Sequence, residues 1–362
     1  MKRYKMTITI LSPVHIGSGQ QIDPLEYLVK DTIFYRLDTA RFLSTLTANL
    51  KAKFNEALKS SNPVTMREFI VDNLDTKKYS LFSAATGPDF EKAYANNVDS
   101  INNQLLVELF PRCGTQLRAY LPGSSIKGAI RTAVVSQLAK PGISPAVYTD
   151  DRGQHPYKSG TRLEKYILRC KDAKQDPFKM LRIADAFLPD DATFIDLAQI
   201  YKRDRAAGAA DPGKIQIFCE QCFSMLDNER ITAEGMLEIN TDLIGKKGVD
   251  RRGNSVDAVS MPLTAEQILN SCKAFYLPKM DHEHKVFYDD NPQLRTHSQK
   301  LLDVKYADNE CPIRIGRFCH VECHTLDNYR EPKTRRGWGK TRTLSAGTMP
   351  MGWVKMRLDE MK

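Results

Sequence analysis

Apolar and polar residues alternate at the start of the chain, where Met6, Ile8 and Ile10 share one face and threonines occupy the other. A period of two is that of a half-buried strand, so the pattern predicts a strand over residues 5–11. Similar alternating or apolar runs predict later strands over residues 181–188, 193–201, 214–218, 236–243 and 351–358.

Other segments place apolar residues at helical spacing. Asp38 is the predicted N-cap of one long helix, whose apolar stripe consists of Phe42, Leu43, Leu46, Leu50, Phe54 and Leu58. Ser124 or Ser125 is predicted to cap a second helix, whose buried stripe consists of Ile126, Ile130, Ala133, Val134 and Leu138. Further helices are predicted over residues 264–277 and 313–326, and residues 62–110 are predicted to form a smaller helical insertion.

Helices and strands follow one another irregularly, and the strands cluster after residue 180. This order favours an α+β fold over a doubly wound parallel sheet. A chain of 362 residues is long enough for about two domains. The charged, glycine-rich segment 245–253 is predicted to be a domain boundary or a protruding hairpin.

The charge balance narrows the class of partner. The chain has 53 Lys and Arg against 44 Asp and Glu, a net charge of +9, which favours nucleic acid first and an anionic membrane surface second. No long uncharged apolar run is present to span a membrane, and the apolar stretch at the start is too short for a signal peptide. We therefore expect a cytoplasmic protein.

Eight cysteines are sparse for this length, and without a secretory signal we expect reduced thiols. Cys219 and Cys222 are the first candidate zinc ligands, but a strand pattern would point them to opposite faces. The second candidate group is Cys319, His320, Cys323 and His324. On a helix this group is equally typical of a buried cysteine stripe beside a solvated histidine stripe, so we predict no metal site and keep zinc as the alternative.

Residues 330–342 hold the densest positive charge in the chain, interleaved with two glycines and Trp338. Cations contact phosphates and an aromatic side chain can stack on a base, so RNA-binding roles are predicted for Arg335, Arg336, Trp338, Lys340 and Arg342. The alternative is a solvated surface loop. The Gly339-Lys-Thr tripeptide lacks the glycine spacing of a P-loop.

Two further segments are candidate RNA contacts. At the predicted helix start, Ser124 and Ser125 lie beside free backbone amides, and Lys127 and Arg131 share a stripe four residues apart. The alternative for these residues is a capped amphipathic helix with two solvated cations.

The other segment is the glycine loop of residues 15–19, with His15, Gly17 and Ser18. His15 is either a general acid or base for RNA cleavage or a hydrogen-bonding anchor of its loop, and the anchor is the more common role. Asp185 follows an apolar strand and is a candidate cation ligand, but no second carboxylate lies near it in sequence.

Four segments in order resemble the RAMP superfamily of CRISPR proteins: residues 11–19 (LSPVHIGSG), 121–133 (LPGSSIKGAIRTA), 181–185 (LRIAD) and 340–354 (KTR…MPMGWV). The resemblance extends from about residue 5 to 358, and the segment 121–133 is its most specific part. The chain looks most like the Csm-type subunit that caps type III-A effector complexes at the 3′ end of the guide RNA (crRNA). It departs from the family at Gly316-Arg-Phe, where a longer glycine run is usual.

The resemblance implies two ferredoxin-like (RRM-like) domains, residues 1–245 with a helical insertion at about 38–110 and residues 246–362. It implies a non-catalytic subunit, without a cofactor, that binds crRNA, is needed for crRNA maturation and packs against sibling Csm subunits. These siblings are the backbone subunit and, as a further candidate, the small subunit. Target RNA is expected to be an indirect partner.

Two alternatives come from the same superfamily. The first is a metal-independent repeat endoribonuclease with His15 as acid or base. The second is the target-cleaving backbone subunit, in which an Asp and a divalent metal cut RNA, but that subunit is typically shorter than this chain.

Overall fold

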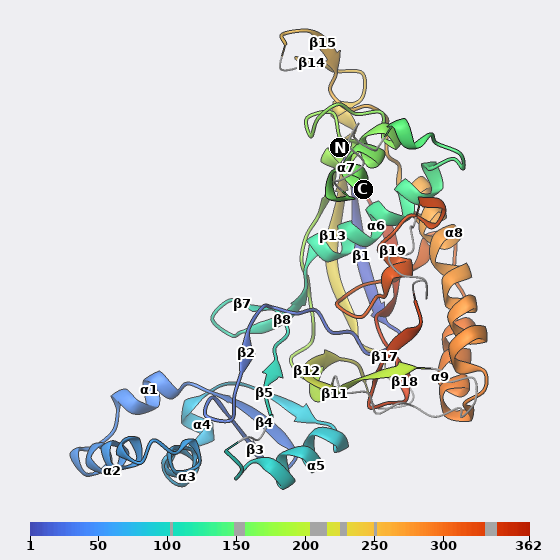
Figure 1. Cartoon of the computed structure of the whole chain (residues 1–362). Helices are drawn as coiled ribbons and strands as arrows, with labels where there is room; N and C mark the ends of the chain where they lie inside the picture. The colour runs from blue at the N-terminus through green and yellow to red at the C-terminus, as the bar shows by residue number, and fades with distance from the viewer. Residues whose placement is uncertain (102–103, 148–155, 203–215, 225–229, 250–251, 330–338) are drawn as a thin grey trace.

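The computed structural model describes the chain apart from residues 102–103, 148–155, 203–215, 225–229, 250–251 and 330–338 (Figure 1). Two large sheets organise these described residues. The first has eight strands in the order β16-β19-β1-β13-β10-β8-β7, with β9 paired to β13. Their bounds are β1 Lys2–Ile10, β7 Arg112–Cys113, β8 Arg118–Leu121, β9 Leu181–Ile183, β10 Ala186–Phe187, β13 Thr232–Ile239, β16 Glu310–Arg314 and β19 Trp353–Met361.

The second sheet has nine strands in the order β2-β6-β12-β11-β5-β4-β3, and β17 joins it through β11 and carries β18. Their bounds are β2 Gln21–Ile22, β3 Tyr27–Lys30, β4 Ile33–Leu37, β5 Ser80–Thr86, β6 Val107–Glu108, β11 Thr193–Lys202, β12 Gln216–Cys222, β17 Thr341–Ser345 and β18 Met349–Pro350. The helices are α1 Thr39–Ser44, α2 Ala48–Lys59, α3 Pro63–Asn73, α4 Thr76–Tyr79, α5 Pro88–Asn97, α6 Gly123–Leu138, α7 Pro156–Ile167, α8 Ala265–Glu283 and α9 Pro292–Leu302. The predicted α+β class is confirmed.

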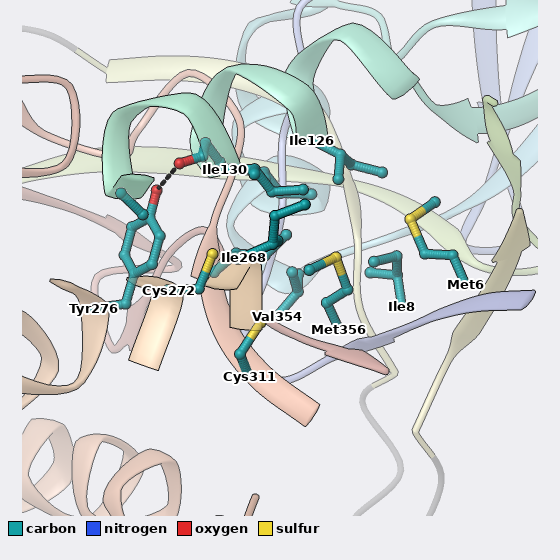
Figure 2. Packing of buried hydrophobic residues seen from close by; sticks show 14 of the residues in the cluster. Met6, Ile8, Ile126, Ile130, Ile268, Cys272, Tyr276, Cys311, Val354 and Met356 are labelled. Carbon is teal, nitrogen blue, oxygen red and sulfur yellow. Dashed lines mark hydrogen bonds between the residues drawn. The ribbon is translucent and has the colours of Figure 1, made fainter. Parts of the chain in front are cut away.

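The main core lies between one face of the eight-stranded sheet and the helices α6 and α8 (Figure 1). Met6 and Ile8 of β1 meet Ile126 and Ile130 of α6 in this core, and all four side chains are inaccessible to solvent (Figure 2). The Tyr276 hydroxyl of α8 donates a hydrogen bond to the Ala129 carbonyl of α6 at 3.0 Å, so the two helices are also joined by a satisfied polar contact.

The opposite face of this sheet, called the outer face below, carries the alternate residues of the same strands. Lys5 of β1 and Met236 of β13 are paired in register and are both exposed. Residues of β1 and β13 that face the helices are mostly buried, and most of the alternate residues are exposed or half-buried, although Thr7 is buried. This pattern is that of a sheet with its main core on one side.

The predicted long helix after Asp38 is broken into two. The Asp38 carboxylate caps α1 as expected and accepts a hydrogen bond from the Arg41 amide at 3.1 Å. The chain then turns at residues 45–47, and the Thr47 hydroxyl caps α2. The apolar residues of α1–α4 form a core of their own, and the predicted insertion 62–110 also contains the strands β5 and β6.

The predicted helix over residues 313–326 is wrong. Ile313 lies in β16, which pairs with β19, and Gly316 then takes a positive φ of 94° that ends the strand. The apolar residues that suggested a helix are buried by this long-range strand pairing and by a short 3-10 turn, Val321–Cys323.

Within the predicted segment 245–253, Lys247–Val249 form β14, which pairs with β15 (Ser255–Asp257) in a hairpin that projects from one end of the molecule (Figure 1). Residue 245 does not separate the two sheets, because β19 pairs with β1 and β17 pairs with β11. The division into domains at this residue stays a prediction. In the part of the chain described, no helix is both long and apolar enough to cross a membrane.

Candidate nucleic-acid interface

The glycine loop after β1 is anchored by His15, whose side chain is fully buried. The His15 Nδ1 atom lies 2.7 Å from the Glu220 carbonyl oxygen of β12. A carbonyl can only accept, so Nδ1 carries the proton and a neutral ring leaves Nε2 as the acceptor. The loop continues from this anchor to Gly17 and Ser18, which are both exposed.

Burial lowers the pKa of His15 below its usual value, opposed by its hydrogen bond to the Glu220 carbonyl and the nearby Glu108 carboxylate. Nε2 lies 3.6 Å from Glu108 Oε2, and Glu108 is itself paired with Arg317. A neutral ring enclosed in this way acts as an anchor of the loop, one of the two roles its sequence context allows.

The segment Gly316–Phe318 closes over the same histidine from the far end of the sequence. The Arg317 amide donates to the His15 carbonyl at 2.9 Å, and the Phe318 ring centroid lies 5.9 Å from that of His15. A Cβ atom at Gly316 would lie 2.3 Å from the His15 carbonyl oxygen, so only glycine permits this approach. The single glycine thus brings the two loops together.

The second predicted contact lies at the start of α6, and its cap differs from the prediction. Ser124 and Ser125 lie inside the first turn, and Pro122 occupies the N-cap position without a side-chain hydrogen bond. The Asp185 carboxylate accepts from the Gly123 amide at 2.8 Å instead. The acceptor comes from a segment 62 residues later in sequence, which local patterns do not reveal. Ser124 remains exposed.

Lys127 and Arg131 share the predicted stripe on α6, but both cations have partners within the chain. Lys127 Nζ donates to the Leu181 carbonyl at 2.6 Å, and burial lowers the pKa of this ammonium. Arg131 contacts Glu164 at 2.9 Å and Asp176 at 2.8 Å. These residues are therefore not two solvated cations, and they hold α6 against the segments around it.

The structure describes only part of the basic segment 330–342, and the residues it describes differ in their exposure to solvent. Arg335, Arg336 and Trp338 lie outside the described residues, so their predicted roles stay predictions. Lys340 is exposed, as an RNA contact requires. Arg342 is not a surface cation: its side chain is 2% exposed and lies inside an ion cluster.

This buried ion cluster consists of Glu283, Arg314 and Arg342. Arg314 Nη1 lies 2.9 Å and Arg342 Nε 2.5 Å from Glu283 Oε1, and the Trp353 indole donates to Glu283 Oε2 at 3.1 Å. Burial acts to raise the pKa of Glu283, but the two guanidinium charges outweigh it and hold this pKa at about 2. The cluster joins α8 to β16 and β17, and hence links the two sheets. A direct RNA contact by Arg342 is therefore incorrect.

The cysteines do not form the metal groups that the spacings allow. Cys219 and Cys222 both lie in β12 but belong to different hydrophobic clusters, as opposite faces of a strand require. Cys319 and Cys323 are buried in the main core. Among the residues described, no group of three or more His, Cys, Asp or Glu side chains is arranged to hold a metal ion.

Sequence reasoning missed an aromatic pair on the outer face. Tyr120 of β8 lies directly opposite Phe187 of β10, with ring centroids 6.0 Å apart. Phe187 is 39% exposed, and the Arg118 guanidinium carbon lies 5.2 Å from its ring centroid. The strands are only four and two residues long, so periodicity gave little signal, although Arg118 and Tyr120 do alternate with buried residues.

A hollow of about 420 Å³ lies between Tyr120 and the glycine loop. Ser18, Gln20, Arg112 and Tyr120 are among the residues that line it. Arg112 is occupied by an ion pair with Glu220. Ser18 of the glycine loop and Tyr120 of the aromatic pair therefore border one concave surface.

The sequence model of the RAMP superfamily matches residues 7–215 of this chain. Among curated proteins, the chain is similar to the CRISPR system Cms protein Csm5 of Methanocaldococcus jannaschii, with 28% identity over 49% of this chain and 41% of that protein. It is also similar to Csm5 of Streptococcus thermophilus, with 24% identity over 51% of this chain and 52% of that protein. The chain thus spans about half the length of these curated relatives.

Two solved structures share the fold over nearly the whole chain. One is a chain of a Csm-crRNA-target RNA ternary complex of a type III-A CRISPR-Cas system, with a TM-score of 0.67, 20% identity and coverage of 98% of this chain and 100% of that chain. The other is Csm5 of T. onnurineus, with a TM-score of 0.65, 21% identity and coverage of 96% and 99%.

Proposed function

Since this chain belongs to the RAMP superfamily, we propose that it is a non-catalytic, crRNA-binding and assembly subunit of a type III-A Csm effector complex. In this role it binds and caps the 3′ end of the guide, contacts the backbone subunits and is needed for crRNA maturation. The observation that carries the proposal is the family match over residues 7–215, together with curated relatives that are Csm5 proteins.

The fold supports this proposal over nearly the whole length of the chain. The chain shares its fold with a subunit of a complex that contains crRNA and target RNA. We extend the likeness to two ferredoxin-like domains, residues 1–245 and 246–362, and to a cytoplasmic location. Sibling Csm subunits are the proposed protein partners, and target RNA is met indirectly.

The glycine loop is the proposed contact with the RNA backbone. His15 anchors it from below, while Gly17 and Ser18 remain exposed and the net charge of +9 favours a polyanion. Ser124 at the start of α6 and the exposed Lys340 are further proposed contacts. Arg335, Arg336 and Trp338 complete the proposed set.

The buried state of His15 supports a non-catalytic role. A general acid or base must reach the proton that it transfers, and the His15 side chain has no exposed surface. We therefore expect His15→Ala to loosen the glycine loop and to leave guide-RNA processing in the complex unchanged.

The experiment is to express the tagged chain with the other complex subunits and a repeat-containing transcript, and to sequence the guide RNA that copurifies. We expect guides with uniform 3′ ends in its presence and absent or heterogeneous ends when the chain is omitted. Incubating the purified chain with repeat RNA, with and without EDTA, should give no cleavage. Cleavage that His15→Ala abolishes would replace this function with that of a repeat endoribonuclease.

A further inference from the structure

We propose that Tyr120 and Phe187 form a stacking platform for a base of single-stranded RNA on the outer face of the eight-stranded sheet. This inference rests on the proposed RNA-binding function and adds a base contact to it. The glycine loop and the start of α6 offer contacts to the RNA backbone, whereas the aromatic pair offers a flat apolar surface of the kind that holds an unstacked base.

The geometry of the pair suits this role. Tyr120 and Phe187 are cross-strand partners on β8 and β10, so both side chains project from the same face. Their ring planes are tilted by 48° at a centroid distance of 6.0 Å, which leaves the two rings side by side and not stacked face to face. Phe187 is 39% exposed, and Met236 of the next strand, 38% exposed, extends the apolar strip.

Charged residues border this strip. Arg118 lies two residues before Tyr120 on the same face, with its guanidinium carbon 5.2 Å from the Phe187 ring centroid. Its side chain is 43% exposed and lies 3.7 Å from the carboxylate of the exposed Asp190. Arg182 of β9 is in register with Glu238 of β13, which places it on this face too, and it is exposed. A base on Phe187 would thus have a guanidinium beside it. Arg182 offers positive charge to a flanking phosphate, and Glu234, which lies opposite Phe187 in register, is paired with Lys5 at 2.6 Å.

The hollow beside Tyr120 gives the strand a route. Ser18 and Gln20 of the glycine loop line the same hollow as Tyr120. An RNA backbone at the glycine loop is thereby brought to the edge of the aromatic pair, so one strand can meet both sites in succession.

A protein partner is the competing occupant, since exposed aromatic, Met and Arg side chains are also typical of protein interfaces. The apolar strip consists of the exposed Phe187 and Met236 and the half-buried Tyr120. Three side chains are few for a stable protein interface, which buries roughly 800 Å² per partner. One base needs only one ring face. The size of the strip therefore favours RNA.

The test compares three side chains at one position by fluorescence anisotropy, using the full chain and a labelled single-stranded RNA. Phe187→Leu keeps an apolar side chain but removes the ring, whereas Phe187→Tyr keeps the ring. Loss of base stacking, worth ~1–3 kcal/mol, predicts an affinity about 5- to 150-fold weaker for Phe187→Leu. Phe187→Tyr should bind within about twofold of the wild type.

Leu277→Ala, at a residue of α8 that is exposed to the same degree, is the matched control and should leave RNA binding unchanged. A second measurement uses RNA with abasic sites, which keeps every phosphate. On that RNA the difference between wild type and Phe187→Leu should disappear. This comparison reports stacking even if Phe187→Leu also alters the local fold.

The outcomes separate the platform from the proposed function. If the wild type binds RNA and Phe187→Leu binds equally well, the platform is wrong and the proposed function stands. If Phe187→Leu keeps its RNA affinity but loses its sibling subunits in the complex, the strip is a protein-docking surface and the platform is again wrong. If the wild type binds no RNA and copurifies with no guide, the proposed function fails, and the platform fails with it.

Discussion

The outer face of the eight-stranded sheet and the buried ion cluster use the same residue types in opposite ways. On the outer face, Lys5 pairs with Glu234 at 2.6 Å while both side chains remain largely exposed. In the cluster, Glu283 lies between Arg314 and Arg342, and all three side chains are at most 3% exposed. The charged side chains on the outer face are accessible to a binding partner, whereas those of the cluster are buried and paired with one another.

Because the two regions differ in solvent exposure, their ion pairs also contribute differently to the free energy of unfolding. An exposed ion pair is screened by water and contributes ~0–1 kcal/mol. A buried charge has lost its hydration, so removing its partner leaves an uncompensated charge in the interior. A cation in a basic segment is therefore an RNA contact only where the fold leaves it in solvent, and Arg342 fails this condition.

The largest effect is expected from breaking the buried cluster. Glu283→Gln removes the charge between two buried guanidinium groups and should lower the free energy of unfolding by ~3–5 kcal/mol. Urea denaturation at neutral pH measures this. The matched control is Glu234→Gln on the outer face, which should cost at most ~1 kcal/mol. Equal losses for the two variants would remove the distinction between the regions.

The second prediction concerns acid. The pKa of Glu283 is held at about 2, below its ordinary value of 4.5, so its contribution is present above pH 4.5 and is lost as the pH falls toward 2. Unfolding free energy should fall over this window, and Glu283→Gln should remove a large part of the slope. A wild-type slope that the variant retains in full would assign acid sensitivity to other carboxylates.

A third prediction concerns Asp196, a carboxyl group whose pKa is raised, in contrast to that of Glu283. Burial raises the pKa of Asp196, in β11, to about 6, against the hydrogen bonds that it accepts from the Leu197 and Phe90 amides. A raised carboxyl pKa means that the folded state holds the proton longer, so stability declines as the pH rises from about 4 to 6. Asp196→Asn should remove this decline, on the order of 2 kcal/mol, measured by urea denaturation at pH 4 and pH 7. If the decline persists in the variant, Asp196 is not its source.

The smallest effect is expected at the half-exposed cations of α6. Lys127→Glu with Arg131→Glu reverses two charges near the proposed RNA contacts and should weaken RNA binding by several-fold. The same substitutions also break the Arg131 pairs with Glu164 and Asp176. Arg131→Ala breaks these pairs without introducing a negative charge, so its unfolding free energy shows how much stability the pairs contribute. Unchanged RNA affinity in the folded double variant would restrict these residues to their structural contacts.

Local sequence patterns correctly predicted those helices and strands whose formation does not depend on contacts with distant parts of the chain. The strand β1 and the start of the helix predicted over residues 264–277 both appear as expected, since a strand period and a helical spacing are set by neighbouring residues. The α6 cap and the fate of Arg342 depend on Asp185 and Glu283, which tertiary structure brings from elsewhere in the chain. The helix expected over 313–326 failed for the same reason, because pairing with β19 overrides the local spacing.

The glycine loop shows the same limit within the candidate site. Its residues were found from the sequence, and the role of His15 as an anchor was one of two alternatives. The contacts that favour the anchor, with the Glu220 carbonyl and the Gly316–Phe318 segment, come from distant parts of the chain. Tyr120 and Phe187 were missed because each lies in a very short strand, and only their pairing across β8 and β10 makes them a unit.

The most direct test of the central claim is copurification of the tagged chain from cells that express the full set of complex subunits and a guide precursor. We expect the chain to bring down both sibling Csm subunits and a guide RNA with a uniform 3′ end. Recovery of the chain without RNA and without sibling subunits, under conditions in which those subunits assemble with one another on the guide, would contradict it.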